Sequence, residues 1–291
     1  RTMTEISDDE GTPFPQFTFL EMPTTRVIVL LLVLTTLAVC QDSAPNPQRR
    51  EADHLPYAPP SLLLKKPPPL PPVDSLVILH GRRDRKVVAL TFDACSTRRP
   101  SHYDERITKI LIETKTPATL FLGGKWMEEE IDQTKYLASI PYFELGNHTF
   151  LHPHLVRMSD ERIRQELSWT QEVLYSLTGR QPTLFRPPYG EEDNRVAGIA
   201  ASMGLRTIQF DLASGDPDSS ISKERLIDYV SSMARGGSII VMHLNQRGWH
   251  TAEALPEILS RLRKRGFTFV TVSGLLAQLQ PSRTTKEKAR N

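Results

Sequence analysis

The 291-residue sequence has little net charge, few cysteines and no apolar run long enough to span a membrane. Its 36 basic and 34 acidic residues leave a formal net charge of +2, which gives no electrostatic footprint for nucleic acid or another polyanion. Of its two cysteines, only Cys95 remains if a leader ending at Cys40 is removed, so no intrachain disulfide then competes for that thiol. With 39% hydrophobic and 24% charged residues, the chain is long enough for one sizeable globular domain with appendages.

The beginning of the chain differs in character from the rest. Residues 1–21 show neither a hydrophobic period nor a capping pattern, and we expect translation to begin at Met22, so 1–21 is predicted not to belong to the native protein. Residues 22–40 combine a short positive region with an apolar run of 14 residues that ends at Cys40. Because a spanning helix needs about 18 apolar residues, this run predicts a signal peptide cleaved after Cys40. An uncleaved membrane anchor and a lipid-attachment box ending at Cys40 are the alternatives.

A proline-rich linker follows over residues 41–73. Ten of the 23 prolines lie between Pro45 and Pro72, and proline fixes φ and removes a hydrogen-bond donor, so this segment is predicted to be extended. The folded domain is predicted over residues 74–280, followed by a polar, disordered tail over 281–291. We therefore expect an exported protein that is secreted, periplasmic or associated with the cell envelope, and that meets a membrane only through its N-terminal segment.

The domain alternates between strand and helix patterns. Ser159 is a predicted helix N-cap and is followed by two acidic residues in the first turn. Apolar residues then recur at helical spacing up to Leu177. Strand-length apolar runs separate such helices and indicate a parallel sheet, in a βα barrel or a doubly wound arrangement. The expected strands are 87–92, 118–122, 142–145, 184–185, 207–210, 238–242 and 267–272.

Two histidines four residues apart, His148 and His152, suggest a metal site. At this spacing on a helical turn, two imidazoles point the same way and can bind one cation, although such pairs also arise by chance. His154 has the wrong spacing to join them and is expected to be exposed.

Further polar motifs stand where other apolar runs end. Thr91-Phe92-Asp93 closes the first predicted strand of the domain, and His243 closes a later one. Between them, residues 186–190 read Arg-Pro-Pro-Tyr-Gly after another short strand. In α/β folds the functional groups gather at the carboxyl ends of the strands, so these motifs are expected to meet.

The order of these motifs resembles that of the polysaccharide deacetylase family, the NodB-homology domain of carbohydrate esterase family 4. The resemblance covers roughly residues 85–277 and is carried by Thr-Phe-Asp, His-Thr-x-x-His and Arg-Pro-Pro-Tyr-Gly. It implies a distorted (β/α)7 barrel. It also implies a metal-dependent hydrolase of linear amides, that is, of carbon–nitrogen bonds other than peptide bonds, acting on the N-acetyl groups of a polysaccharide.

The resemblance also assigns roles to individual residues. It implies that His148 and His152 bind a divalent metal, that Asp93 is the base that takes the proton of the attacking water, and that His243 is the acid. The unperturbed pKa of histidine, about 6.5, suits the last role. Taken singly, Asp93 could instead cap a loop, and His243 could be an ordinary buried histidine.

Three residues would support this chemistry by the same resemblance. Arg186 would pair with and orient Asp93, the backbone N–H of Tyr189 would face the oxyanion, and Asp216 would hold the imidazole of His243. Arg186 alone could also be a structural ion pair. Asp211 competes with Asp216, because the family has tryptophan after this aspartate and the chain has proline.

The chain departs from the family directly after Asp93. Where the family has a second aspartate that completes the metal ligands, this sequence has Ala94. A catalytic zinc site normally has three protein ligands, so a third is missing. Asp93 itself, water, or Cys95 as a thiolate could replace it, and a thiolate with two imidazoles favours zinc. Zn²⁺ is the expected ion, with Co²⁺ as an alternative.

The predicted function is removal of acetyl groups from a cell-wall or extracellular polysaccharide, with peptidoglycan or a chitin-like glycan as the expected substrate. No nucleic-acid partner is expected. The missing ligand keeps two alternatives open, a non-catalytic glycan-binding module on the same fold and a metal-independent amidohydrolase of a small amide.

Overall fold

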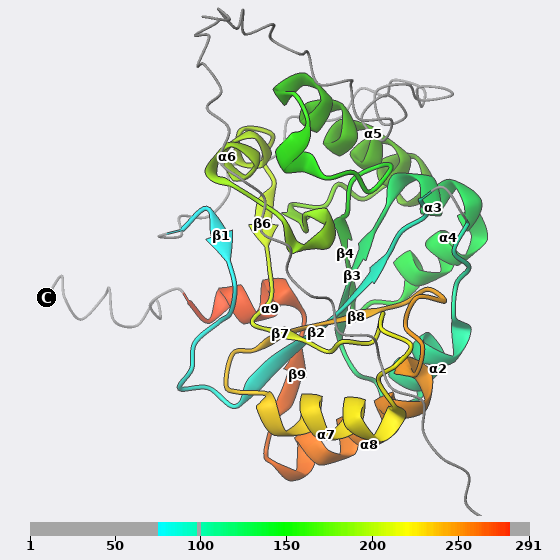
Figure 1. Ribbon diagram of the computed structural model, residues 1–291, viewed down its shortest axis with the longest axis vertical. Coiled ribbons are helices and arrows are strands. Elements are labelled where there is room, and N and C mark those ends of the chain that lie inside the picture. The colour runs from blue at the N-terminus through cyan, green and yellow to red at the C-terminus, as the bar shows by residue number, and fades with distance from the viewer. Residues whose placement is uncertain (1–74, 98–99, 280–291) are drawn as a thin grey trace, which may run out of the picture. The chain divides into compact units, whose positions relative to one another are not determined.

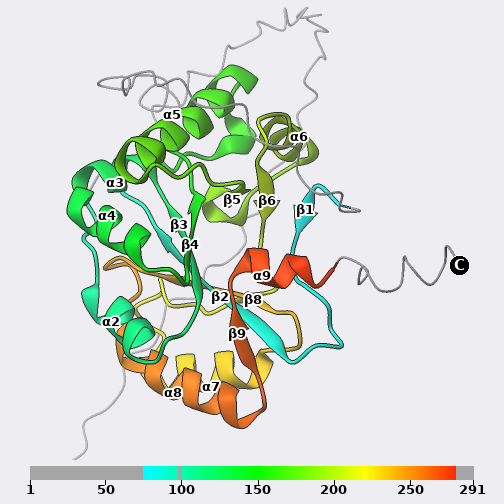
Figure 2. The same ribbon diagram turned by 180° about the vertical axis from the view of Figure 1, so that it is seen from behind.

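One curled sheet of parallel strands forms the centre of the part of the chain that the structure describes (Figure 1, Figure 2). The computed structural model describes residues 75–97 and 100–279, and within them the sheet has nine strands in the order β1-β6-β5-β4-β3-β2-β8-β7, with β9 also paired to β2. All of these strand pairs are parallel. The strands are β1 (Val77–Ile78), β2 (Val87–Ala94), β3 (Ala118–Leu122), β4 (Phe143–Asn147), β5 (Leu184–Phe185), β6 (Arg206–Ile208), β7 (Leu212–Ala213), β8 (Ile239–His243) and β9 (Thr268–Val270).

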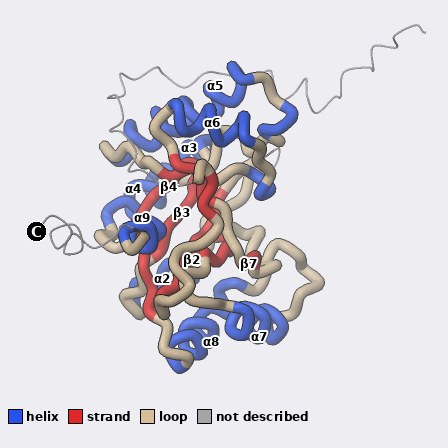
Figure 3. Tube along the Cα trace, turned by 90° about the vertical axis from the view of Figure 1, so that its left-hand side faces the viewer, coloured by secondary structure: helices blue, strands red, loops and turns tan. Residues whose placement is uncertain are grey.

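Helices connect the strands and lie around the sheet (Figure 3). Within the described residues, none of them is long and apolar enough to cross a lipid bilayer. The helices are α2 (Glu105–Glu113), α3 (Gly124–Glu129), α4 (Ile131–Ser139), α5 (Asp160–Thr178), α6 (Asn194–Ser202), α7 (Lys223–Met233), α8 (Thr251–Lys264) and α9 (Val272–Ala277), with 3₁₀ turns η1 (Leu155–Arg157) and η2 (Pro188–Gly190).

All seven predicted strands are present, and Ser159 caps α5 as expected, its hydroxyl accepting from the N–H of Arg162. The strand predicted over 207–210 ends earlier, at Ile208, where the carbonyls of Ile208 and Gln209 accept from the Arg186 guanidinium. Strands β1 and β7, of two residues each, were not predicted. The predicted leader, linker and tail (1–21, 22–40, 41–73 and 281–291) lie outside the described residues.

The central strand β2 presents two different faces. Leu90, Phe92 and Ala94 are fully buried in the larger apolar core, which the strands share with the surrounding helices. The intervening residues Thr91 and Asp93 point to the opposite face, because successive side chains of a strand alternate. The inner side of the curled sheet is therefore the side on which polar groups gather.

The strand register brings the predicted motifs to one edge of the sheet. Asp93 lies opposite His243 of β8, and Asn147, which precedes His148, lies opposite Phe185, which precedes Arg186. Because the strands are parallel, their carboxyl ends meet at the same edge.

The start of α3 packs tightly against the segment that follows β4. A Cβ atom added at Gly124 would overlap the ring of Phe150, which is buried. We expect Gly124→Ala to destabilise the fold by about 1–3 kcal/mol, since a methyl group inserted into a packed interior forces its neighbours to shift.

Chemical denaturation of the variant measures this effect, with Gly198→Ala as the matched control. No atom lies within 4 Å of a Cβ added at Gly198, which sits inside α6. Alanine there should be neutral or stabilise by roughly 0.5–1 kcal/mol. Equal stabilities of the two variants would contradict the packing argument.

Candidate active site

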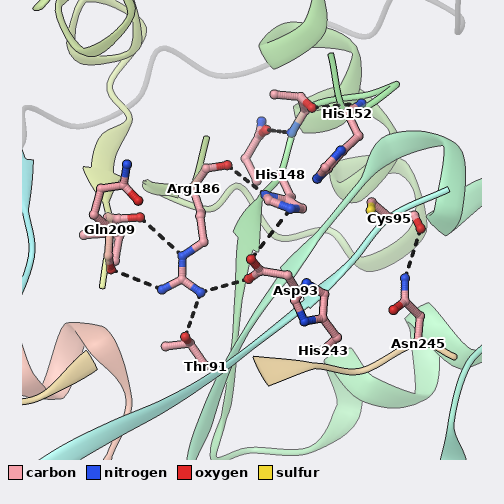
Figure 4. A network of polar contacts seen from close by, with 12 residues as sticks. Thr91, Asp93, Cys95, His148, His152, Arg186, Gln209, His243 and Asn245 are labelled. Atoms are coloured by element: carbon pink, nitrogen blue, oxygen red, sulfur yellow. Dashed lines mark hydrogen bonds and ion pairs between the residues drawn. The ribbon is translucent and has the colours of Figure 1, made fainter. Parts of the chain in front are cut away.

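Asp93, at the end of β2, is held by the buried guanidinium of Arg186 (Figure 4). One guanidinium nitrogen lies 2.8 Å from Asp93 Oδ1 and 2.7 Å from the Thr91 hydroxyl oxygen. The other nitrogens donate to the carbonyls at the end of β6, and the guanidinium stacks over the ring of Phe121 at 4.2 Å. The carboxylate is therefore fixed through Oδ1, while Oδ2 faces the site.

His148 follows β4 and is oriented by the backbone of the same arginine. Its Nδ1 lies 2.8 Å from the Arg186 carbonyl oxygen, which can only accept a hydrogen bond, so Nδ1 carries the proton in the neutral ring. Nε2 is then the atom with a free lone pair, and it lies 3.7 Å from Asp93 Oδ2. A hydrogen bond of this kind fixes the tautomer and direction of histidines that bind metals.

The segment from His148 to His152 is a loop, so the predicted helical turn is wrong. Thr149 and His152 both have left-handed backbones, with φ values of 64° and 57°. The side chain of Asn147 accepts from the Thr149 N–H at 2.9 Å, and the Thr149 hydroxyl accepts from the His152 N–H at 3.1 Å. The imidazoles still come together, with 4.9 Å between their ring centroids.

Glu166 of α5 shapes this loop, and the sequence reasoning missed it. Its Oε2 accepts from the backbone N–H groups of Phe150 and Leu151, both at 2.8 Å, and its Oε1 pairs with Arg162 at 2.8 Å. Burial raises the pKa of the Glu166 carboxyl, and these donors oppose that effect. A charged residue among the buried, apolar positions of a helix was the signal that could have found it.

Cys95 lies beside both imidazoles. One ligand atom from each of Cys95, His148 and His152 lies within 4.8 Å of the others. Burial, with Asp93 adding to it, raises the pKa of the Cys95 thiol to about 12. Figure 4 shows the sulfur turned toward the histidine rings.

The two histidines have the properties of metal ligands. Burial lowers the pKa of His148 and, more strongly, that of His152, so both rings are neutral at pH 7. The Nδ1 atom of His152 is buried and has no hydrogen-bond partner among the described residues. Neutral imidazoles fit a divalent cation, which needs a ring nitrogen that carries no proton.

His243 and Asp216 form a second pair on the other side of Asp93. His243 Nδ1 lies 2.8 Å from Asp216 Oδ1, while Asp216 Oδ2 accepts from the His243 N–H and the Thr251 hydroxyl. Burial acts to lower the pKa of His243, but the charge and hydrogen bond of Asp216 outweigh it, with a further contribution from Asp93, so that this pKa is raised.

The competing aspartate, Asp211, lies at the other end of β8. Its carboxylate accepts from the N–H of Ile239 at 2.8 Å and from the Ser238 hydroxyl at 2.9 Å, and it pairs with Arg83. The structure therefore brings Asp216, and not Asp211, to the imidazole of His243.

Tyr189 stands at the rim of the site. It lies in the 3₁₀ turn after β5, has a φ of 61° and is 53% exposed. Its ring lies 4.5 Å from that of His152 and stacks on His154 at 4.0 Å. The expectation that His154 is exposed is wrong, because this stacking and a 2.9 Å contact with Glu191 half-bury it.

Comparison with known proteins identifies the family. The sequence model described as polysaccharide deacetylase matches residues 80–208. A bifunctional xylanase/deacetylase of Pseudobutyrivibrio xylanivorans is 31% identical over 193 residues, which are 66% of this chain and 31% of that protein. A peptidoglycan-N-acetylglucosamine deacetylase of Bacillus cereus is 30% identical over 196 residues, which are 66% of this chain and 89% of that protein.

A solved structure shares the fold. It is a pseudoenzyme of carbohydrate esterase family 4 from Bacillus anthracis, with a TM-score of 0.63 and 28% identity, covering 69% of this chain and 68% of that one. The predicted fold, a distorted barrel of parallel strands and helices, is thereby confirmed. The chain spans 31% of the length of the xylanase/deacetylase, so the likeness to that protein is to a part of it. By sequence and by fold, the chain belongs to the polysaccharide deacetylase family.

Proposed function

We propose that the protein is a hydrolase that removes acetyl groups, above all N-acetyl groups, from a cell-wall or extracellular polysaccharide such as peptidoglycan or a chitin-like glycan. One observation carries the proposal: the Asp93 carboxylate and the His243 imidazole stand at the ends of adjacent strands, and each is held by its own charged partner. The relatives named as deacetylases support the choice of substrate. Export of the protein, as the leader predicts, is part of this proposal.

A divalent cation, with Zn²⁺ favoured and Co²⁺ the alternative, would be held by His148, His152 and a third donor. When bound, it would supply Lewis acidity and an acidified water for attack on the acetyl carbonyl. The remaining steps depend on the residues of the chain.

Asp93 and His243 divide the proton transfers between them. Asp93 Oδ1 is occupied by Arg186, so Oδ2 is the atom that takes the proton of the attacking water. His243, held through Nδ1 by Asp216, has Nε2 available to donate a proton to the departing amine. The backbone N–H of Tyr189 would stabilise the oxyanion.

Exposed aromatic side chains near the site suit a sugar polymer. Tyr189 contacts His152. Trp249 is 56% exposed, and its backbone N–H donates to the Asp216 carbonyl. Large exposed rings beside a polar site are typical of binding surfaces.

The proposed activity is tested by incubating the purified chain with N-acetylglucosamine oligomers and Zn²⁺ or Co²⁺, and measuring released acetate. We expect acetate release that stops on chelation. Release that persists after exhaustive chelation would contradict the metal requirement.

One alternative has support of its own, a non-catalytic glycan-binding module. Ala94 replaces the family's second aspartate, and the fold resembles that of a pseudoenzyme. Oligomer binding without acetate release, at any concentration of metal, would favour this module over the hydrolase.

Asp93→Asn should depress kcat by roughly 10²- to 10⁴-fold with little effect on KM, because the base is lost while the shape of the side chain is kept. Metal content should stay near normal in Asp93→Asn and be lost in His148→Ala. Steady-state kinetics and metal analysis of both variants check this. Near-normal metal in His148→Ala would refute its assignment as a ligand.

Asp216→Asn should move the alkaline limb of the kcat/KM profile to lower pH. The Asp216 charge helps to raise the pKa of His243, so the wild-type imidazole keeps its proton to higher pH, and removal of the charge ends this effect. The matched control is Asp218→Asn in the same loop, because Asp218 is exposed and its carboxylate accepts hydrogen bonds from Ser220, not from His243. An unchanged alkaline limb in Asp216→Asn would argue against His243 as the acid.

A further inference from the structure

We propose that Cys95 is the third protein ligand of the metal, binding as a thiolate in place of the family's second aspartate, so that the site is a Cys-His-His centre selective for zinc. The inference concerns the metal site of the proposed hydrolase. That the bound ion takes part in catalysis rests on the proposed function. It assigns a ligand set that differs from the one the resemblance implies.

Ala94 offers no donor atom, and the direction of the side chains on β2 favours residue 95. Ala94 is the last residue of the strand, pairs with Leu122 of β3, and is fully buried in the apolar core on the helix side. The next side chain on the inner face, two positions after Asp93, is therefore that of Cys95. Cys95 is 3% exposed and belongs to none of the apolar clusters of the described residues.

The distances agree with a shared ion. Among the described residues, Cys95, His148 and His152 are the group of potential ligands whose donor atoms lie within 4.8 Å of one another, and Asp93 is not part of it. Tetrahedral zinc with Zn–S of about 2.3 Å and Zn–N of about 2.0–2.1 Å places its donor atoms roughly 3.5 Å apart. Side-chain shifts on the order of 1 Å would close the site.

An independent observation also indicates a ligand. The Nδ1 atom of His152 is buried and has no hydrogen-bond partner among the described residues, although a buried polar atom without a partner costs about 1–3 kcal/mol. His152 is thus a neutral, buried imidazole beside the thiol, and the neutral ring is the form that binds a cation.

The backbone on both sides holds Cys95 in place. The Cys95 carbonyl accepts from the Asn245 side chain at 3.0 Å, and the Ala94 carbonyl accepts from the Gly123 N–H at 2.8 Å. The following residues of α3 hold the histidine loop, since the Gly124 and Lys125 N–H groups donate to the carbonyls of residues 149 and 150. The thiol and the imidazoles are thus anchored to one segment.

The chemistry of the donors selects the ion. A thiolate is a soft ligand, and a site with one thiolate and two imidazoles suits Zn²⁺ better than Mg²⁺ or Ca²⁺, which prefer oxygen donors. Catalytic zinc sites of other folds also combine cysteine with histidine ligands and keep an open fourth position.

The test uses the full chain, stripped of metal and loaded with Co²⁺ as a spectroscopic probe. Wild type should show a thiolate-to-cobalt charge-transfer band in the near ultraviolet, and Cys95→Ser should lose it. Loss of a residue that only hydrogen-bonds to a metal ligand already lowers metal affinity roughly 10- to 100-fold. The zinc affinity of Cys95→Ser, which loses a ligand itself, should fall by at least that factor. Cys95→Asp, which offers a carboxylate, should retain zinc but show no band.

The other cysteine of the chain supplies the matched control, because Cys40→Ser should keep both the band and the zinc affinity. A band that survives in Cys95→Ser, or an unchanged zinc affinity, would overturn the proposal, provided that circular dichroism shows the variant to be folded. Acetate release is measured separately. A band that depends on Cys95 without acetate release would leave the ligand assignment standing and reject the proposed hydrolase, whereas acetate release without the band would do the opposite.

Discussion

The candidate site depends on the buried pairing of Arg186 with Asp93. A guanidinium removed from water is tolerated only when its donors are satisfied, and here Thr91, Asp93 and two carbonyls at the end of β6 accept them. The carbonyl of the same arginine fixes the tautomer of His148. Breaking such a pair typically costs about 3–5 kcal/mol, because the remaining charge is left buried without a partner. One residue thus connects the proposed base, one proposed metal ligand and three strands.

The histidine loop illustrates how an unfavourable local conformation can be held in place. Left-handed backbones at Thr149 and His152 each cost about 1 kcal/mol or more for residues with a Cβ atom. Asn147 and Glu166 compensate with hydrogen bonds to the backbone N–H groups of the loop, and Glu166 is itself paired with Arg162. The two imidazoles can therefore meet without a helix between them.

Strand periodicity and the order of motifs along the chain were enough to predict the parallel sheet and to place Asp93, Arg186 and His243 at one edge of it. The conformation between His148 and His152 was not predictable, because spacing alone does not distinguish a helical turn from a loop held by a distant carboxylate. Neither could the sequence decide between two aspartates in one loop, since both occur in turn-forming surroundings. That choice depends on the register of β8, which is a tertiary property.

A carboxylate that acts as a base needs a free oxygen, and this requirement bears on the missing ligand. Asp93 Oδ1 is bound to Arg186, so only Oδ2 is available. If Oδ2 also bound the cation, its basicity would fall, and the same oxygen would have to serve both as ligand and as base. The proposed ligand two positions further along the same face of the chain would remove this conflict, because it would bind the ion and leave Oδ2 beside it. Alanine at residue 94 is therefore compatible with the proposed hydrolysis as long as Cys95 remains on the inner face.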